Sequence, residues 1–323
     1  MPNPKVGLNS FIGFGEQSGY TTSVTTTDFL PMISGGDSIN REDATIKSGS
    51  LESVGVKNTR YKKGKRDVNG SETVELLYEG SEVLFKHLFG QVATSQPSPG
   101  GAPTVYDHQF TITSALPTGL TLEIGRSDQS FKVTGAKITS VELSQSVDQY
   151  IQAAFSFIGR DKATMVQGSA SLPSVNGWVS PEVTLSWNNA QQDVKQWSVN
   201  IANNLDADSY FIGSKLRKEP MRGGRVEVKG SFETEFTSTT LWDDFAAATE
   251  RQIIIAAVGD QIGSTGYYYS WTMTIPIALL TGTPINVNDG GPIRYTASWE
   301  AFRTASAGEV TLFIRNTVST VSA

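Results

Sequence analysis

Cysteine is absent from this sequence of 323 residues, and only two histidines occur. A disulfide framework, a thiolate nucleophile and a cysteine-ligated metal site are therefore excluded. His87 lies among apolar residues of a short helix candidate, and His108 stands at the start of a predicted strand. No nucleophile-elbow motif accompanies either residue. We interpret both histidines as structural, and we predict a protein that is not an enzyme and needs no cofactor or metal.

Long hydrophobic runs are also missing. The longest apolar stretches, residues 253–258 and 275–280, have the length of strands and are too short to cross a bilayer as helices. Residues 1–15 lack the basic start and the continuous apolar segment of a signal peptide. The sequence therefore predicts a protein that is synthesised inside the cell and has no membrane partner.

Positive charge is in short supply. The net charge is −6, the isoelectric point is about 5.1, and charged residues make up 18% of the chain. Proteins that hold nucleic-acid phosphates tightly need many lysines and arginines on one surface. The composition argues against tight DNA binding, although an acidic protein can lie beside DNA without holding it.

The residues that are abundant, among them threonine, serine, valine and glycine, favour β-structure. Residues 67–76 and 226–236 alternate apolar and polar side chains, which is the period of a strand with one buried and one wet face. We therefore predict a mainly β fold of the sandwich or barrel type.

An internal repeat divides the chain. Residues 68–76 resemble residues 228–236, which lie 160 positions later. Each copy has the same surroundings: a basic loop before it (60–66 or 215–225), then a helix candidate (81–89 or 239–249) and an alternating strand (151–157 or 293–299). The repeat predicts two tandem β-domains, residues 1–165 and 166–323, each with one short flanking helix.

An ordered set of motifs covers residues 11–160. It includes GFGEQSGY at residues 13–20, FLP at 29–31, DVNGS at 67–71 after the basic loop, and FTI at 110–112. This set resembles the larger phage tail tube proteins, and the second half resembles them mainly through the repeat. The resemblance implies a structural virion protein whose rings stack into a hollow conduit for DNA ejection. It also implies that a chain with two such domains forms trimeric rings that imitate a hexamer.

The resemblance further implies partners and a location. The expected partners are other copies of the chain, together with tail terminator, tape measure and distal tail proteins. Phage DNA would pass through without specific binding. The expected location is the virion tail, after assembly in the host cytoplasm. A terminator or a distal tail ring on the same fold stays open as an alternative role.

The basic loops are the candidate contacts between rings, because charged loops can dock on acidic surfaces of a neighbour. A nucleic-acid patch and a plain solvated loop remain alternatives. The residues predicted to make this contact are Arg60, Tyr61, Lys62, Lys63, Arg66, Arg217 and Lys218.

The polar residues opposite the apolar sets of the strands are the candidate channel wall. An acidic wall would repel DNA phosphates and allow the genome to slide. The residues predicted to face the lumen are Ser71, Thr73, Glu75, Glu227, Glu233, Glu235 and Glu300.

Three other patterns have both a functional and a plain interpretation. Residues 13–19 are rich in glycine but lack the strand and helix of a phosphate-binding loop, which favours a flexible N-terminal arm. Residues 203–208 alternate oxygen ligands but lack the glutamate and glycine of a calcium loop, which favours an ordinary turn. All six tryptophans lie in the second half, where core packing is their commoner use. They also suggest the rival function, a carbohydrate- or receptor-binding β-domain of a phage baseplate or tail tip.

Overall fold

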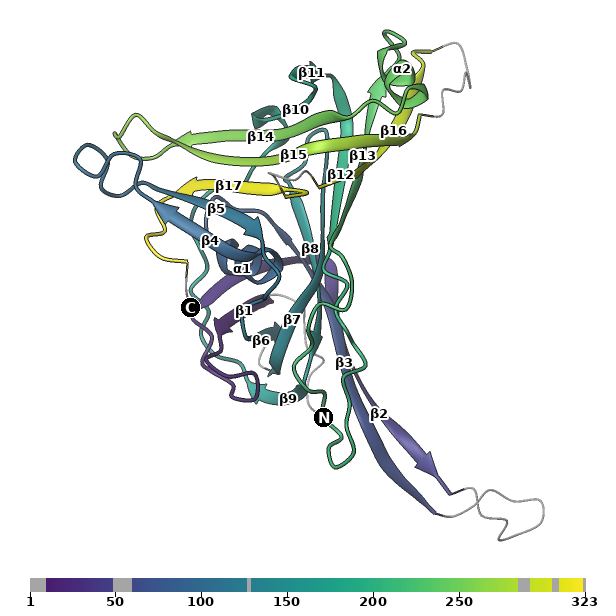
Figure 1. Ribbon diagram of the computed structural model, residues 1–323. Helices are drawn as coiled ribbons and strands as arrows, with labels where there is room; N and C mark the ends of the chain where they lie inside the picture. Colours follow the sequence, from purple (N-terminus) through teal and green to yellow (C-terminus); the bar gives the residue numbers. More distant parts are fainter. Residues whose placement is uncertain (1–9, 49–59, 127–128, 284–290, 304–307, 322–323) are drawn as a thin grey trace.

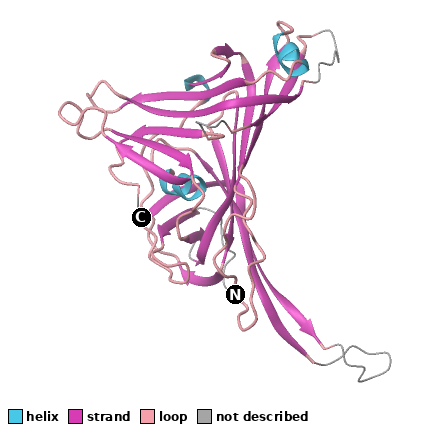
Figure 2. Ribbon diagram, in the orientation of Figure 1, coloured by secondary structure: helices cyan, strands magenta, loops and turns pink. Residues whose placement is uncertain are grey.

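The structure is a computed structural model, and it describes residues 10–48, 60–126, 129–283, 291–303 and 308–321. The fold is mainly β, as the composition predicted, with 57% strand, 6% helix and a six-stranded barrel. Figure 2 shows strands forming nearly the whole body, with the helices confined to short segments.

The chain order of the elements is as follows. The first half contributes β1 (Phe11–Glu16), β2 (Asp28–Lys47), β3 (Tyr61–Glu75), α1 (Glu82–Phe89), β4 (Gly90–Ser95), β5 (Tyr106–Ile112), β6 (Leu120–Arg126), β7 (Gln129–Ser146), β8 (Gln152–Gly159) and β9 (Asp161–Val166). The second half contributes the 3₁₀ turn η1 (Ser180–Glu182), β10 (Val183–Trp187), β11 (Ala190–Gln192), β12 (Val194–Ala202), β13 (Glu227–Glu235), α2 (Thr240–Ala246), β14 (Arg251–Gln261), β15 (Tyr268–Gly282), β16 (Arg294–Ala301) and β17 (Thr311–Asn316).

Eight strands form a continuous antiparallel central sheet in the order β2-β3-β8-β7-β12-β13-β16-β15. The first four strands belong to the first half, and the last four belong to the second. Along the chain, β2, β3, α1, β7 and β8 occur in the same relative order as β12, β13, α2, β15 and β16. The two halves thus place corresponding strands at corresponding positions, and the pairing of β7 with β12 joins them (Figure 1).

The repeat extends to close packing around one glycine in each half. A Cβ added at Gly70 would lie 2.6 Å from the Phe157 ring and 2.4 Å from a serine carbonyl oxygen on the neighbouring strand. A Cβ added at Gly230 would lie 2.6 Å from the Trp299 ring and 2.2 Å from the corresponding serine oxygen. A side chain at either position would clash with the neighbouring strand and ring. This explains why glycine recurs at this place in the sequence repeat.

Both predicted helices are present. Helix α1 ends where Gly90 adopts a left-handed conformation with φ of 106°. Helix α2 is shorter than predicted, because Ala248 has a φ of 48° and cannot continue the helix. Among the described residues, neither α-helix has the length and apolar character needed to traverse a membrane.

One hydrophobic core includes side chains from both halves, such as Phe155 of β8 and Phe232 of β13. Trp178 of the second half packs on Tyr78 of the first half with ring centroids 4.6 Å apart. The boundary predicted at residues 165 and 166 falls at the end of β9, which pairs with β7. The halves share a sheet and a core, so the division into two domains stays a prediction.

The glycine-rich segment at residues 13–19 differs from its prediction. Gly13, Phe14 and Gly15 lie inside β1, which pairs with β2 and with β6, and Phe14 is fully buried. A Cβ at Gly15 would lie 2.7 Å from the carbonyl oxygen of Thr25. The prediction of a flexible arm was wrong for these residues, because the glycines permit close packing of backbone. Residues 1–9 lie outside the described part of the chain.

Candidate assembly surfaces

The central sheet is polar on one face. Along β13, Val228 and Phe232 are buried on one side and Ser231 lies on the other. Ser231 lies opposite Ser198 of β12 and Ser298 of β16, so the face continues across the strands. We call this side the polar face. Its members are Ser71, Thr73, Glu75, Glu142, Ser144, Gln152, Ser156, Ser198, Asn200, Glu227, Lys229, Ser231, Glu233, Glu235, Thr296, Ser298 and Glu300.

Every residue predicted to face a lumen lies on this polar face. The residues come from β3, β13 and β16, and strands β8, β7 and β12 connect them without a break. The sequence argument missed Glu142 of β7, which lies opposite Asn200 of β12. The sequence Val141, Glu142 and Leu143 alternates apolar and polar side chains in the same way as residues 67–76 and 226–236, so this alternation could have identified Glu142.

Negative charge dominates the polar face, because its glutamates outnumber its own cation, Lys229, and Arg294, which lies opposite Glu235. Lys229 pairs with Glu227 at 3.2 Å, and Arg294 pairs with Glu235 at 3.5 Å. Exposed pairs of this kind contribute little to stability, because water screens both charges. The hydrogen bond from Lys229 also lowers the pKa of Glu227, so this carboxylate is ionised at neutral pH. The face is therefore wet and acidic.

Strands β2 and β3 form a long hairpin that projects from the body of the molecule (Figure 1). Its pairing extends outward to Lys47 and Tyr61. Tyr61 is 69% exposed, and Lys62 and Lys63 beside it are exposed as well. Arg60 is also exposed, and residues 49–59 lie outside the described residues. Residues 61–66 of the predicted basic loop are thus part of strand β3, and only residues 60–63 lie at the outer end of the hairpin, away from the core.

A comparison with protein families agrees with this architecture. The model of a family described as phage tail tube protein matches residues 7–301, which is most of the chain. The chain belongs to the phage tail tube protein family. This confirms the predicted resemblance. The family is one of structural proteins and not of enzymes, and membership implies a component of the virion tail. No curated protein matches the chain.

In this tail tube protein, Arg66 is engaged within its own chain. Its side chain is 11% exposed and pairs with Asp43 at 2.7 Å and with Asp161 at 2.6 Å. The hydrogen bonds from Arg66 and Arg41 hold the pKa of Asp43 at about 2. Arg66 thus ties both strands of the hairpin to the start of β9.

Arg217 is engaged within the chain as well, and its side chain is only 2% exposed. It pairs with Asp67 and donates hydrogen bonds to the carbonyl oxygens of Val68, Gly159 and Ala207, the last at 2.8 Å. We call residues 203–226 the brace loop, because this buried arginine fastens them to the base of the hairpin. Lys218, the next residue, is exposed.

The two basic loops that the sequence placed in separate halves lie against each other. The backbone amide of Arg66 donates to the carbonyl oxygen of Lys215 at 2.8 Å, and the Tyr210 hydroxyl donates to the carbonyl oxygen of Arg66 at 2.6 Å. Lys65 pairs with Asp208 at 2.8 Å. The structure therefore brings part of both loops together at the hairpin base, and leaves Tyr61, Lys62 and Lys63 apart.

The brace loop begins at the C-terminal end of α1. The fully buried amide of Asn203 donates to the carbonyl oxygens of Leu88 and Ile138 at 2.9 and 3.1 Å. Asp206 accepts from Ser209 at 3.1 Å. These bonds engage the polar groups that had suggested a cation site. No group of three or more histidines or acids suited to a metal occurs among the residues that the structure describes.

The histidines and five of the six tryptophans take packing roles. His87 on α1 is buried and lies 3.1 Å from Glu16, and His108 on β5 is buried and lies 3.0 Å from Asn316. Trp242 is 47% exposed, whereas the other five tryptophans are in the core. Buried rings present no surface to a sugar, so the observation that had suggested a carbohydrate-binding domain loses its force.

A buried acid lies at the base of the hairpin. Glu72 is on the core side of β3, opposite Asp37 of β2 and Phe155 of β8, and its side chain is fully buried. Asp37 pairs with Arg126 at 2.5 Å. Burial, together with the negative charge of Asp37, raises the pKa of Glu72 to about 9. Glu72 therefore keeps its proton in the folded protein at neutral pH.

This shift predicts a pH-dependent stability. In the unfolded chain Glu72 ionises near its ordinary value of 4.5, but in the folded chain it ionises only near 9. Between these values the unfolded state binds fewer protons, so the free energy of unfolding falls as pH rises. Glu72→Gln removes the titrating group and keeps its shape. We expect the variant to match the wild type near pH 4 and to exceed it by 1 kcal/mol or more at pH 8, on the order of the energy of one pKa unit.

Urea denaturation at pH 4, 6 and 8 measures this difference. If the variant loses stability with pH as steeply as the wild type, Glu72 is not the responsible group.

Proposed function

We propose that this chain is the major tail tube subunit, which polymerises into stacked rings whose hollow centre conducts phage DNA during ejection. The polar face is the observation that carries the proposal. It crosses strands of both halves without a break, while the other side of the same strands is packed in the core. A sheet with one wet face suits the wall of a water-filled channel. Its acidic character would repel phosphates and let DNA slide.

The edges of the central sheet support closure into a ring. Within the described residues, 37–47 of β2 pair with β3 alone, and 279–282 of β15 pair with β16 alone. Unpaired edges attract other strands. In this proposal β15 of one chain pairs with β2 of the next, which repeats the junction that β7 and β12 make inside the chain. Three chains then close a ring with pseudo-sixfold symmetry.

Contacts between rings are assigned to the projecting hairpin. Arg60, Tyr61, Lys62 and Lys63 would meet acidic residues of the adjacent ring, with Lys218 at a second point. Arg66 and Arg217 would act indirectly by holding the base of the hairpin. Exposed charges are screened over about 8 Å at physiological ionic strength. Tube growth followed by light scattering should therefore slow as salt is raised, and a rate independent of salt would contradict this contact.

The remaining partners follow from the tail tube role. The proposal places a tail terminator and distal tail proteins at the ends of the tube, and tape measure protein and then DNA inside it. Assembly would take place in the host cytoplasm and the product would be part of the virion.

Electron microscopy of the purified protein tests the proposal. We expect regular hollow tubes whose end views show three subunits and six similar lobes. Persistent monomers at high concentration would refute the assembly, and rings of six whole chains would refute the trimer.

A further inference from the structure

The brace loop presents an apolar tip to solvent. Phe211 is 62% exposed and Ile212 is fully exposed. The tip is a tight turn, closed by the amide of Ser214 donating to the carbonyl oxygen of Phe211, with Gly213 at a φ of 95°. Lys218 lies 5.3 Å from the centre of the Phe211 ring. The turn and the buried Arg217 hold two large apolar side chains in water, which is costly unless they are covered in use.

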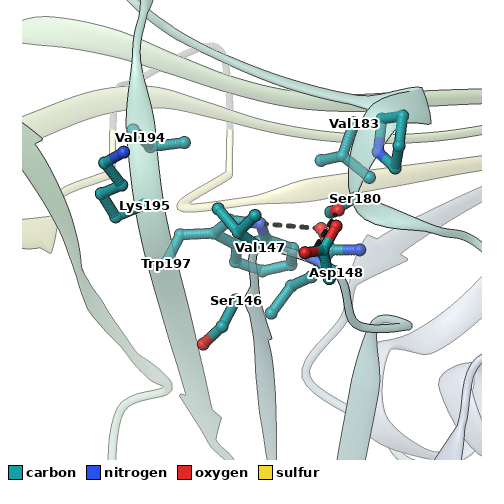
Figure 3. Close-up of a pocket in the computed structure, with 10 residues that line it drawn as sticks. Ser146, Val147, Asp148, Ser180, Val183, Val194, Lys195 and Trp197 are labelled. Atoms are coloured by element: carbon teal, nitrogen blue, oxygen red, sulfur yellow. Dashed lines mark hydrogen bonds between the residues drawn. The ribbon is translucent and has the colours of Figure 1, made fainter.

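A groove of matching character lies at the opposite end of β12. Figure 3 shows Val147 and Trp197 on its floor, with Val183 and Val194 on either side. The hollow has a volume of about 290 Å³, and an adjoining hollow of the same size shares its three valines. Val147 is 53% exposed. A hollow of this size admits one or two apolar side chains and is small for a drug-sized ligand.

The tip and the groove also match in charge. Lys215 and Lys218 flank the tip, whereas the exposed Asp148 and Asp193 flank the groove. Lys195 in the groove lies 4.0 Å from Glu235, which partly offsets its charge. Opposite charges around two apolar patches steer them into register and disfavour other partners.

The two patches cannot meet within one chain. Strand β12 starts in the groove at Val194 and ends at Ala202, and the brace loop continues to the other end of the molecule (Figure 1). A patch and a complementary patch at opposite ends of one subunit make a heterologous contact, which repeats along an axis instead of closing a pair.

We infer that the tip of one chain, Phe211 and Ile212, inserts into the Val147–Val183–Val194 groove of a second copy in the adjacent ring. The inference rests on the proposed stacking of rings, and it adds an apolar contact to the charged hairpin contact. Apolar burial is insensitive to screening. The tip and groove would therefore hold the tube at salt concentrations that weaken the hairpin contact.

Cysteine cross-linking tests the contact directly, because the natural chain has no cysteine. The test variant carries Ile212→Cys and Val147→Cys, and the control carries Ile212→Cys and Val258→Cys. Val258 is a valine of similar exposure, at 56%, on β14. A disulfide requires Cβ atoms within about 4.5 Å. We expect oxidised tubes of the test variant to give a ladder of cross-linked chains extending beyond one ring, and the control to stay largely monomeric under denaturation.

The failures are distinguishable. If tubes form but the test variant gives no ladder, or both variants cross-link equally, the inference is overturned and the tube function stands. Products that stop at one small fixed size would place the contact within a ring and also overturn it. If a ladder forms but electron microscopy shows no tubes, the contact is supported and the proposed function is refuted.

A second measurement uses the variant Phe211→Ser with Ile212→Ser. It should slow tube growth at least about tenfold, because two apolar side chains lose their burial.

Discussion

Glu142→Lys is expected to leave the fold and the tube intact and to slow the passage of DNA roughly tenfold or more. Glu142 is exposed on β7, where the strands of the two halves join. Each chain repeats the change, so every ring would add cations to the proposed wall, and lysines bind phosphates. Combining it with Glu75→Lys on β3 should enlarge the effect. Exposed substitutions change stability by only about 0.5 kcal/mol, so assembly should survive.

The measurement is the rate of DNA release from particles built with the variant, at low and at high salt. Glu250→Lys makes the same charge change at an exposed position between α2 and β14 that is not one of the polar-face residues. Release should be close to normal for this control. The slowing by Glu142→Lys should weaken with salt, because phosphate attraction is screened. Equal slowing by both variants would contradict the assignment of the polar face to the lumen.

Arg217→Ala is expected to lower the free energy of unfolding by about 3 kcal/mol. Truncation leaves the buried carbonyl oxygens of Val68 and Gly159 without their charged donor. Asp67 adds less, because its side chain is 42% exposed and water can replace the lost partner. Loss of the arginine also releases the brace loop from the hairpin base, so tube growth should fall along with stability.

Urea denaturation of the unassembled protein measures this effect. Lys218→Ala is the matched control, because it removes a neighbouring but exposed cation and should cost no more than about 0.5 kcal/mol. Arg217→Lys should fall between the two, since one ammonium cannot reach all the oxygens that the guanidinium does. If Arg217→Ala is no less stable than Lys218→Ala, the buried arginine does not brace the hairpin.

Several elements followed from local chemistry and could be predicted. The alternation along β3 and β13 requires one buried and one wet face, and the structure has both. Helix α1 needed an apolar stripe and a glycine that can adopt positive φ, which are visible at residues 82–90. The recurrence of Gly70 and Gly230 indicated a repeated strand, and a side chain at either position would meet an aromatic ring.

Other features could not be predicted, because local pattern does not show what covers a residue. The basic residues Arg66 and Arg217 looked like surface charges, but carboxylates and carbonyl oxygens from distant segments surround them. The glycines of β1 looked flexible, whereas Gly15 permits close contact with the backbone oxygen of Thr25 and Gly13 with the ring of Phe29.

The sequence by itself determined the mainly β class, the position of α1, the repeat and the polar residues of β3, β13 and β16. Only the tertiary structure decided that β7 pairs with β12, so that the polar residues of both halves form one polar face, and that the brace loop lies on the hairpin. The physical reason is the separation along the chain over which each effect acts. Period and turn chemistry act between neighbours along the chain, whereas strand pairing and burial depend on which distant segments compete for the same edge and the same core.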